Sequence, residues 1–212
     1  MPQRRLQHVL RDFHRTLRDS RDFAAEAYGW SLTGARPHIS RSRRDSITEL
    51  AFLRAFLGWE GFLEESFLLY MLGQTSPRGR VPHRFAFPPN RTHAEEWTIP
   101  EGRSYATWDA ANVIERAQRF FRSGHPFTNT LRANRNMLDE TRTIRNAIVH
   151  ESRSADEKFR NLARTRLGTL PSNLTVGTFL CTAIPGASPP QSFLESYLER
   201  IELVAQQIIP GA

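Results

Sequence analysis

The hydrophobic residues of this chain recur every three or four positions over most of its length, a spacing that predicts helices. In residues 3–28 they share one face, and arginines dominate the opposite face. In residues 46–73 apolar side chains surround most of the circumference, so we expect this stretch to be the central helix of the core. It begins with Ser46 and Glu49 at the spacing of a capping box.

Further segments share the helical period and are bounded by the glycine, proline or serine residues that mark helix ends. They are residues 107–123, a long stretch from residue 128 to just past His150, residues 154–168, and a last helix opened by Ser188. Segments rich in proline, glycine and polar residues predict loops. These are residues 30–44, residues 74–103 with one helical turn near 92–97, and residues 169–190. The pattern predicts an all-α bundle of about five to six helices with long irregular loops, in a single domain over residues 1–212.

The stretch from Leu131 to Ser154, LRANRNMLDETRTIRNAIVHESRS, has two unlike faces when wound as a helix. Its buried face is expected to contain Met137, Thr141, Ile144 and Ile148. A polar stripe lies opposite, formed by Arg135, Asp139, Arg142, Asn146, His150 and Arg153. His150 falls in the last turn, where the helix dipole favours the imidazolium form. The end of this helix is therefore a candidate site for chemistry.

The composition adds a strong positive charge. The chain has 29 basic and 22 acidic residues, a net charge of +7, and Lys158 is its only lysine. Genomic base composition can replace lysine by arginine, but it leaves the excess of positive charge unexplained. Because the arginine fork suits phosphate, we expect a polyanionic partner. The single cysteine, Cys181, and the charged N-terminus predict a cytoplasmic protein without disulfides or membrane association.

The common active-site signatures are absent from the sequence. It contains no glycine-rich phosphate loop, no HExxH, no paired-cysteine pattern and no Gly-x-Ser-x-Gly elbow. The seven histidines are scattered, without the helical spacing of metal ligands. Any catalysis is therefore expected to need neither a metal nor another cofactor.

The motif RNAIVH, from Arg145 to His150, resembles the Arg-x4-His motif, in its RNxxxH form, of the HEPN superfamily of helical domains. Longer segments resemble the bacterial MAE-like and RiboL-PSP-type members and together cover nearly the whole chain. They are FLRAFLGWEGFLEESFLLYMLG, GHPFTNTLRANRNMLDETRTIRNAIVHES and TFLCTAIPGASPPQSFLESYLERIELVAQQII. The resemblance implies a HEPN-type bundle and a metal-independent endoribonuclease of toxin-antitoxin, abortive-infection or antiviral-defence type. It makes Arg145 and His150 the catalytic pair and Asn146 a supporting residue.

The chemistry of these residues agrees with that role. Metal-free RNA cleavage needs a group that moves a proton, which suits His150, and a cation at the phosphorane, which suits Arg145. Five helical positions correspond to roughly 140° of rotation, so these two side chains point apart, whereas Asn146 and His150 share a direction. A working site is more easily assembled from two chains, and the resemblance implies the same. We therefore expect a homodimer with a composite, arginine-rich groove.

Other residues are candidates for supporting roles. Glu60 or Glu64 on the central helix is a candidate to hold Arg145, unless both are ordinary surface acids. Further candidates to contact RNA along the groove are Arg135, Arg142 and Arg153. Two other functions stay open: a non-catalytic RNA- or nucleotide-binding module, and a helical subunit that binds an antitoxin or other defence-system partner through the loop at residues 74–103. Binding that weakens steeply with salt would favour the module.

Overall fold

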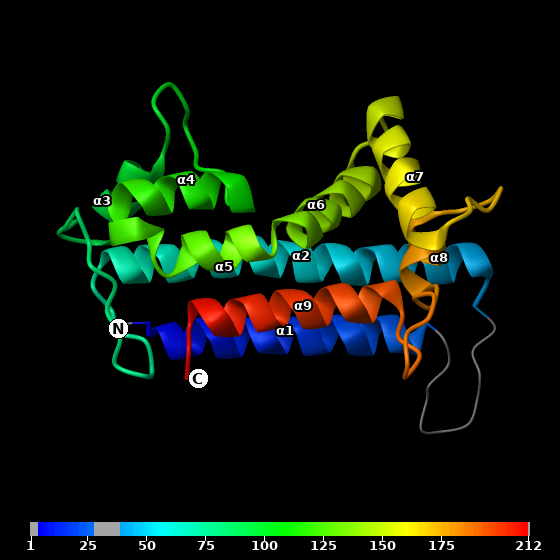
Figure 1. Cartoon of the computed structure of the whole chain (residues 1–212), viewed down its shortest axis with the longest axis horizontal. Helices are drawn as coiled ribbons and strands as arrows, with labels where there is room; N and C mark the ends of the chain where they lie inside the picture. The colour runs from blue at the N-terminus through cyan, green and yellow to red at the C-terminus, as the bar shows by residue number, and fades with distance from the viewer. Residues whose placement is uncertain (1–3, 28–38, 212) are drawn as a thin grey trace. The chain divides into compact units, whose positions relative to one another are not determined.

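The structure is a computed structural model that describes residues 4–27 and 39–211. These residues form nine α-helices, one short 3-10 helix and no strand beyond isolated bridges, so the all-α prediction is confirmed. The elements are α1 (Leu6–Glu26), α2 (Arg41–Met71), α3 (Arg91–Thr98), α4 (Ala110–Phe120), η1 (Arg122–Gly124), α5 (Phe127–Ala133), α6 (Arg135–Val149), α7 (Arg153–Leu167), α8 (Val176–Cys181) and α9 (Phe193–Ile208) (Figure 1). No helix in the described part of the chain is long and apolar enough to cross a membrane.

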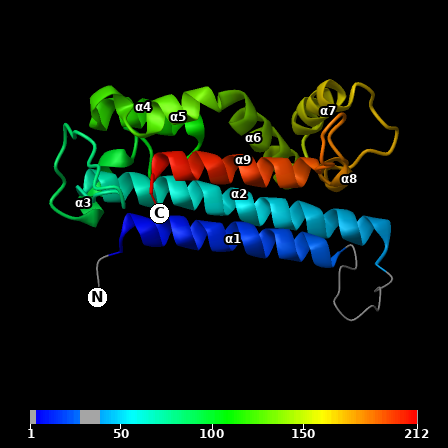
Figure 2. The same ribbon diagram turned by 60° about the horizontal axis from the view of Figure 1, so that its bottom comes forward.

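The chain divides into two compact units. Unit 1 comprises Met1–Arg15, Gly58–Arg135 and Ile201–Ala212, and unit 2 comprises Thr16–Leu57 and Asn136–Arg200. Helices α1, α2 and α9 contribute residues to both units, and Arg135, the first residue of α6, belongs to unit 1 while the rest of α6 belongs to unit 2. In each unit α1 lies beside α2 with the opposite chain direction (Figure 2), as the Phe13–Trp59 ring contact in unit 1 and the Arg54–Asp19 ion pair in unit 2 require.

The core of unit 1 is built around Phe67 of α2, which is fully buried. Its ring lies 5.1–6.2 Å from the rings of four aromatic residues of the α4–α5 region, namely Trp108, Phe120, Phe121 and Phe127. Helices α4 and α5 accordingly run next to one another along the second half of α2 (Figure 1). One turn further along α2, the hydroxyl of Tyr70 donates to the carbonyl of Ile208 at 2.9 Å and ties the end of α9 to this core.

The core of unit 2 joins α7, α8 and α9 through stacked rings. Phe179 of α8 stacks on Phe193 of α9 at 4.5 Å and meets Phe159 of α7 edge-on at 5.6 Å. Helix α1 is attached to α9 by an ion pair between Arg21 and Glu195 at 3.0 Å. Helix α8 lies in the segment 169–190 that the sequence predicted to be irregular. That prediction was wrong for these six residues, which are too few to show a helical period.

The central helix begins earlier than predicted. It starts at Arg41 instead of Ser46, so the last residues of the predicted loop 30–44 are helical, while residues 30–38 of that loop lie outside the described part. Ser46 is not a cap, because its hydroxyl donates to the carbonyl of Ser42 one turn earlier at 3.1 Å. Not all of the apolar residues of this helix are buried, since Leu50 is 53% exposed and Leu57 is 56% exposed.

The long helix predicted from residue 128 to just past His150 is two helices. The break falls at Asn134, whose side-chain amide donates to the carbonyl of Thr130 at 2.9 Å and whose backbone leaves helical geometry. Two predicted helix starts are also wrong, because other serines form the caps. Ser152 caps α7 in place of Ser154, and the last helix begins at Phe193 after Ser192 instead of at Ser188.

The helical turn predicted near residues 92–97 is confirmed as α3, which Asn90 caps by accepting from the backbone of His93 at 3.1 Å. The predicted end at Gly168 is confirmed for α7, where this glycine has a φ of +75°. The predicted helix at 107–123 is shorter, because Asp109 caps α4 through two backbone N–H groups.

Gly177 gives the first prediction, on stability. Its N–H donates to Glu49 at 2.8 Å, and an added Cβ would lie 2.5 Å from the Cα of Asp45, so α8 packs directly on the start of α2. We expect Gly177→Ala to lower the free energy of unfolding by about 1–3 kcal/mol, the usual cost of overpacking. Urea unfolding measures this difference.

The matched control for that experiment is Gly61→Ala, because a Cβ at this helical glycine meets nothing within 4 Å. Removing a glycine from the interior of a helix should raise the free energy of unfolding by about 0.5–1 kcal/mol. Equal effects of the two substitutions would contradict the close contact between α8 and α2.

Candidate active site

Helix α6 carries most of the residues that the sequence singled out, and its two faces are as predicted except at Ile148, which was expected to be buried and is half-buried. Its buried side chains are Met137, Leu138, Thr141 and Ile144. Arg135, Asp139 and Arg142 are exposed on the opposite face, and Asn146 and Ile148 are half-buried. The burial of one face fixes the rotation of α6 about its axis, so the polar stripe points outward as expected. Arg153 departs from the stripe, because it is the first residue of α7.

His150 lies directly after α6, in the short link to α7. Its backbone N–H donates to the carbonyl of Asn146 at 2.9 Å, so it closes the last helical turn, and its side chain is exposed. Two residues later Ser152 starts the next helix by accepting from Ala155 at 3.2 Å. The imidazole is therefore held between two helix ends and is open to solvent.

A cavity of about 370 Å³ opens beside this imidazole within unit 2. It is lined by Ala147, His150, Glu151, Ser152, Arg153, Asp156, Phe159, Leu174, Thr175 and Val176. Of the predicted site residues, the cavity brings together His150 and Arg153. Two of the charged groups on its wall have partners, Arg153 with Glu157 at 2.9 Å and Asp156 with Arg160 at 2.7 Å.

Arg145 lies in a different environment. Its guanidinium carbon is 5.2 Å from the centre of the Phe56 ring, and its Nη1 donates to the side-chain oxygen of Asn146 at 2.8 Å. Neither Arg145 nor Asn146 is among the described residues that line the His150 cavity. The separation of Arg145 from His150 agrees with five positions of helical rotation. Stacking on Phe56 and the bond to Asn146 hold the guanidinium in one orientation.

The contacts that hold α6 in place come from Glu140 and were not predicted from the sequence. Glu140 of α6 accepts from Arg166 of α7 at 2.5 and 3.1 Å and from the hydroxyl of Tyr197 of α9 at 2.8 Å. Burial raises the pKa of Tyr197, and the negative charge of Glu140 adds to the effect. These partners are 26 and 57 positions from Glu140, so no helical spacing could have revealed them. A bidentate arginine contact of this kind fixes both distance and angle between helices.

Glu60 and Glu64, the predicted supporting acids, lie in unit 1, whereas Arg145 lies in unit 2. Their role at Arg145 stays a prediction. Within unit 1, burial raises the pKa of Glu64, and the nearby charge of Glu65 raises it further. The charge of Arg91 and a hydrogen bond from Trp108 act in the opposite direction. Among the described residues, no three histidine, cysteine or acidic side chains are grouped so that they could hold a metal ion.

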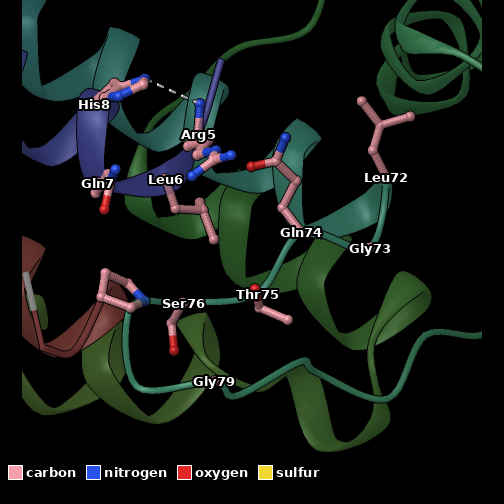
Figure 3. Close-up of a pocket in the computed structure, with 11 residues that line it drawn as sticks. Arg5, Leu6, Gln7, His8, Leu72, Gly73, Gln74, Thr75, Ser76 and Gly79 are labelled. Atoms are coloured by element: carbon pink, nitrogen blue, oxygen red, sulfur yellow. Dashed lines mark hydrogen bonds between the residues drawn. The ribbon is translucent and has the colours of Figure 1, made fainter. Parts of the chain in front are cut away.

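A larger cavity, about 890 Å³, lies in unit 1 between the start of α1 and the segment that follows α2 (Figure 3). Its wall includes Arg5, His8, Gln74 and Ser76, and none of the predicted site residues is among those that line it. Gln74 reaches across to the start of α1, where its amide donates to the carbonyl of Arg4 at 2.7 Å. Of these two cavities, the smaller one is lined by predicted site residues, namely His150 and Arg153.

In comparisons with known proteins, no family model, no curated protein and no solved structure matches this chain. Function is therefore inferred from the residues themselves and from the geometry in which the fold holds them.

The pKa of Glu64 leads to a second prediction. Because the pKa of Glu64 is raised, its carboxyl binds a proton more tightly in the folded protein than in the unfolded chain. This difference stabilises the folded protein at acidic pH, and the stabilisation is lost as the pH rises through the raised pKa. We expect Glu64→Gln to raise the free energy of unfolding at pH 7, with a smaller gain near pH 4, in urea unfolding at both values.

Glu115→Gln serves as the control, because the side chain of Glu115 is 71% exposed and pairs with Arg119 one turn away at 3.5 Å. The difference in free energy of unfolding between pH 7 and pH 4 should be the same in Glu115→Gln as in the unchanged protein. The opposite result is that Glu64→Gln lowers the free energy of unfolding at pH 7 more than it does at pH 4. That result would show that the charged carboxylate is favoured by its neighbours.

Proposed function

We propose that this protein is a metal-independent endoribonuclease of the HEPN type, in which His150 and Arg145 act on RNA. The observation that carries the proposal is the exposed imidazole of His150, held at the end of α6 beside a cavity that also exposes Arg153. The net charge of +7 favours a polyanionic substrate. The assignment to the HEPN type rests on the resemblance of the RNAIVH motif to the motif of that superfamily.

The proposed reaction uses the 2′-hydroxyl of the RNA as its nucleophile. The His150 imidazole takes the proton from this hydroxyl as its oxygen bonds to phosphorus, and the bond from phosphorus to the 5′-oxygen breaks. Water gives a proton to the departing 5′-oxygen and the His150 imidazolium returns its proton to solvent, so the products are a 2′,3′-cyclic phosphate and a 5′-hydroxyl. Arg145 stabilises the extra negative charge of the phosphorane, for which a guanidinium already oriented by Phe56 and Asn146 needs little rearrangement.

The composite site follows from the directions of these two side chains. His150 lines the cavity, whereas Arg145 lies over Phe56 and is not among the residues that line it, which supports a site shared between two chains. In a homodimer, Arg145 of one copy and His150 of the other would meet at the shared groove. Unit 2 also exposes apolar side chains that a second copy would cover: Leu50, Leu57 and Val149 are each about half exposed.

The remaining predicted residues fit the same proposal. Arg135 and Arg142 on the outer face of α6 would contact phosphates outside the scissile bond, and Arg153 would contact the phosphate nearest His150. A role as a toxin or antiviral effector in the cytoplasm, with an antitoxin as its partner, belongs to this proposal through the superfamily resemblance alone.

The third prediction tests the chemistry. The purified protein should cleave RNA in EDTA and leave cyclic-phosphate ends. His150→Ala should slow cleavage by at least about 100-fold, the usual contribution of a general acid or base. Arg145→Ala should slow it by about 100- to 1000-fold. Arg145→Lys keeps the charge but not the fork and should also be strongly impaired.

His125→Ala is the matched control, because it removes an exposed histidine in unit 1 and should leave the rate unchanged. Circular dichroism checks that each variant is folded. If no RNA is cut while all variants bind RNA equally, the protein is a non-catalytic binding module. Absence of both cleavage and binding would leave the partner-subunit interpretation.

The fourth prediction tests the composite site. The His150→Ala and Arg145→Ala proteins, each inactive alone, are mixed in equal amounts and allowed to exchange subunits. Half of the dimers then hold one chain of each kind, and one of their two sites is complete, so the mixture should recover about a quarter of the unchanged activity. A mixture that stays inactive although a pull-down through a tag on one variant recovers the other would place the whole site within one chain.

A further inference from the structure

The segment of unit 1 between α2 and α3 exposes apolar side chains in a regular pattern. Over residues 81–88 exposure alternates: the odd-numbered residues are exposed and the even-numbered ones are buried or half-buried. The outward side chains are Val81, His83, Phe85 and Phe87, which we call the aromatic row. Phe85 is 56% exposed and Phe87 is 67% exposed. In a chain with a large apolar core, two adjacent outward phenylalanines indicate a binding surface.

The aromatic row is held firmly by its backbone. The N–H of Phe85 donates to the carbonyl of Phe120 at 2.9 Å, and the carbonyl of His83 accepts from Arg122 at 2.9 Å. These bonds form a bridge between Arg84 and Phe121 and hold the segment beside the end of α4, with a bend in the chain at Phe85. Figure 1 shows the connection between α2 and α3 as a non-helical loop. The exposure of the row therefore belongs to an ordered segment.

Arg84 fixes the row from its inner side. Its Nη1 donates to the carbonyl of Met71 at 2.8 Å, and its guanidinium lies 4.9 Å from the centre of the Phe87 ring. The guanidinium also packs on Gly73, where an added Cβ would come within 2.7 Å of it and where φ is +84°. One face of the Phe87 ring is thus covered by a cation, and the ring remains 67% exposed.

The sequence around the row carries positive charge, although Arg91 at its far end is paired with Glu65 and Glu95. From residue 74 to residue 94 the sequence contains four arginines and two histidines but no aspartate or glutamate. Arg78 and Arg80, which directly precede the row, are exposed. Aromatic residues and arginine are also enriched at protein–protein interfaces, so these residue types alone do not choose between a protein and a nucleic acid. Arginines without acidic residues beside exposed aromatic rings are typical of surfaces that bind single-stranded nucleic acid.

We propose that the aromatic row binds single-stranded RNA by stacking bases on Phe85 and Phe87 while Arg78 and Arg80 contact the phosphates. Phe85 and Phe87 are two positions apart and both exposed, so each ring can receive its own base. The choice of RNA rests on the proposed function. The row would hold part of the substrate away from the bond that is cut, and it would not take part in the chemistry.

Binding is tested apart from cleavage, in the His150→Ala background, with a fluorescein-labelled twelve-residue oligouridine and fluorescence anisotropy. Adding Phe85→Leu and Phe87→Leu keeps apolar side chains but removes the rings, and it should weaken binding by about tenfold or more for each ring. Phe85→Trp with Phe87→Trp should preserve or strengthen binding. Leu203→Ala, which trims a side chain of unit 1 that is 50% exposed, should have no effect.

The phosphate contacts are tested by the salt dependence of the same binding. Arg78→Ala and Arg80→Ala should each reduce the slope of log K against log salt by about 0.7, the value for one phosphate of a single strand. Equal affinity of the leucine variant and its parent would overturn the proposal. So would a loss of self-association in light scattering without a change in RNA affinity, which would assign the row to a second copy of this chain.

The outcomes separate this proposal from the ribonuclease proposal. If the unchanged protein cuts RNA but the leucine variant binds as well as its parent, the aromatic row is not a binding surface and the ribonuclease stands. If the unchanged protein cuts no RNA but the leucine variant loses affinity, the row is confirmed as a binding surface and the protein is a binding module.

Discussion

Burial of the apolar side chains of α2 is the constraint on which both units depend. Its second half places Phe67 and Tyr70 in the core of unit 1, and its first half places Phe52 and Phe56 in the core of unit 2. Each such side chain contributes about 1.5–3 kcal/mol when fully buried. The same burial serves the candidate site, because one face of Phe56 supports the guanidinium of Arg145.

The candidate site combines a fixed helix with an accessible end. Glu140 is tied to Arg166 and Tyr197, so α6 is held against α7 and α9 through a charge-assisted network that is partly shielded from water. Beyond the last turn of α6, His150 meets solvent at a cavity whose other wall comes from residues 174–176. A positioned imidazole that solvent and substrate can reach is what the proposed transfer of a proton from the RNA hydroxyl requires.

Periodicity predicted the buried faces well and the helix boundaries poorly. The inner residues of α6, such as Met137 and Ile144, are buried as expected, because a helix exposes or hides side chains with a fixed period. Boundaries depend instead on single hydrogen bonds. Asn134 ends α5 by bonding to Thr130, and Ser152 starts α7 by accepting from Ala155. Several serines and asparagines in these segments have suitable spacing, and the sequence does not show which one finds its partner.

The sequence by itself determined the all-α class, the outward stripe of α6 and the position of His150 at a helix end, because these follow from local spacing. Only the tertiary structure decided that Arg145 rests on Phe56, that residues 174–176 complete the cavity beside His150, and that Phe85 and Phe87 stay exposed. Such contacts join residues far apart in the chain. They depend on how whole helices pack, which the order of residues within any one segment does not specify.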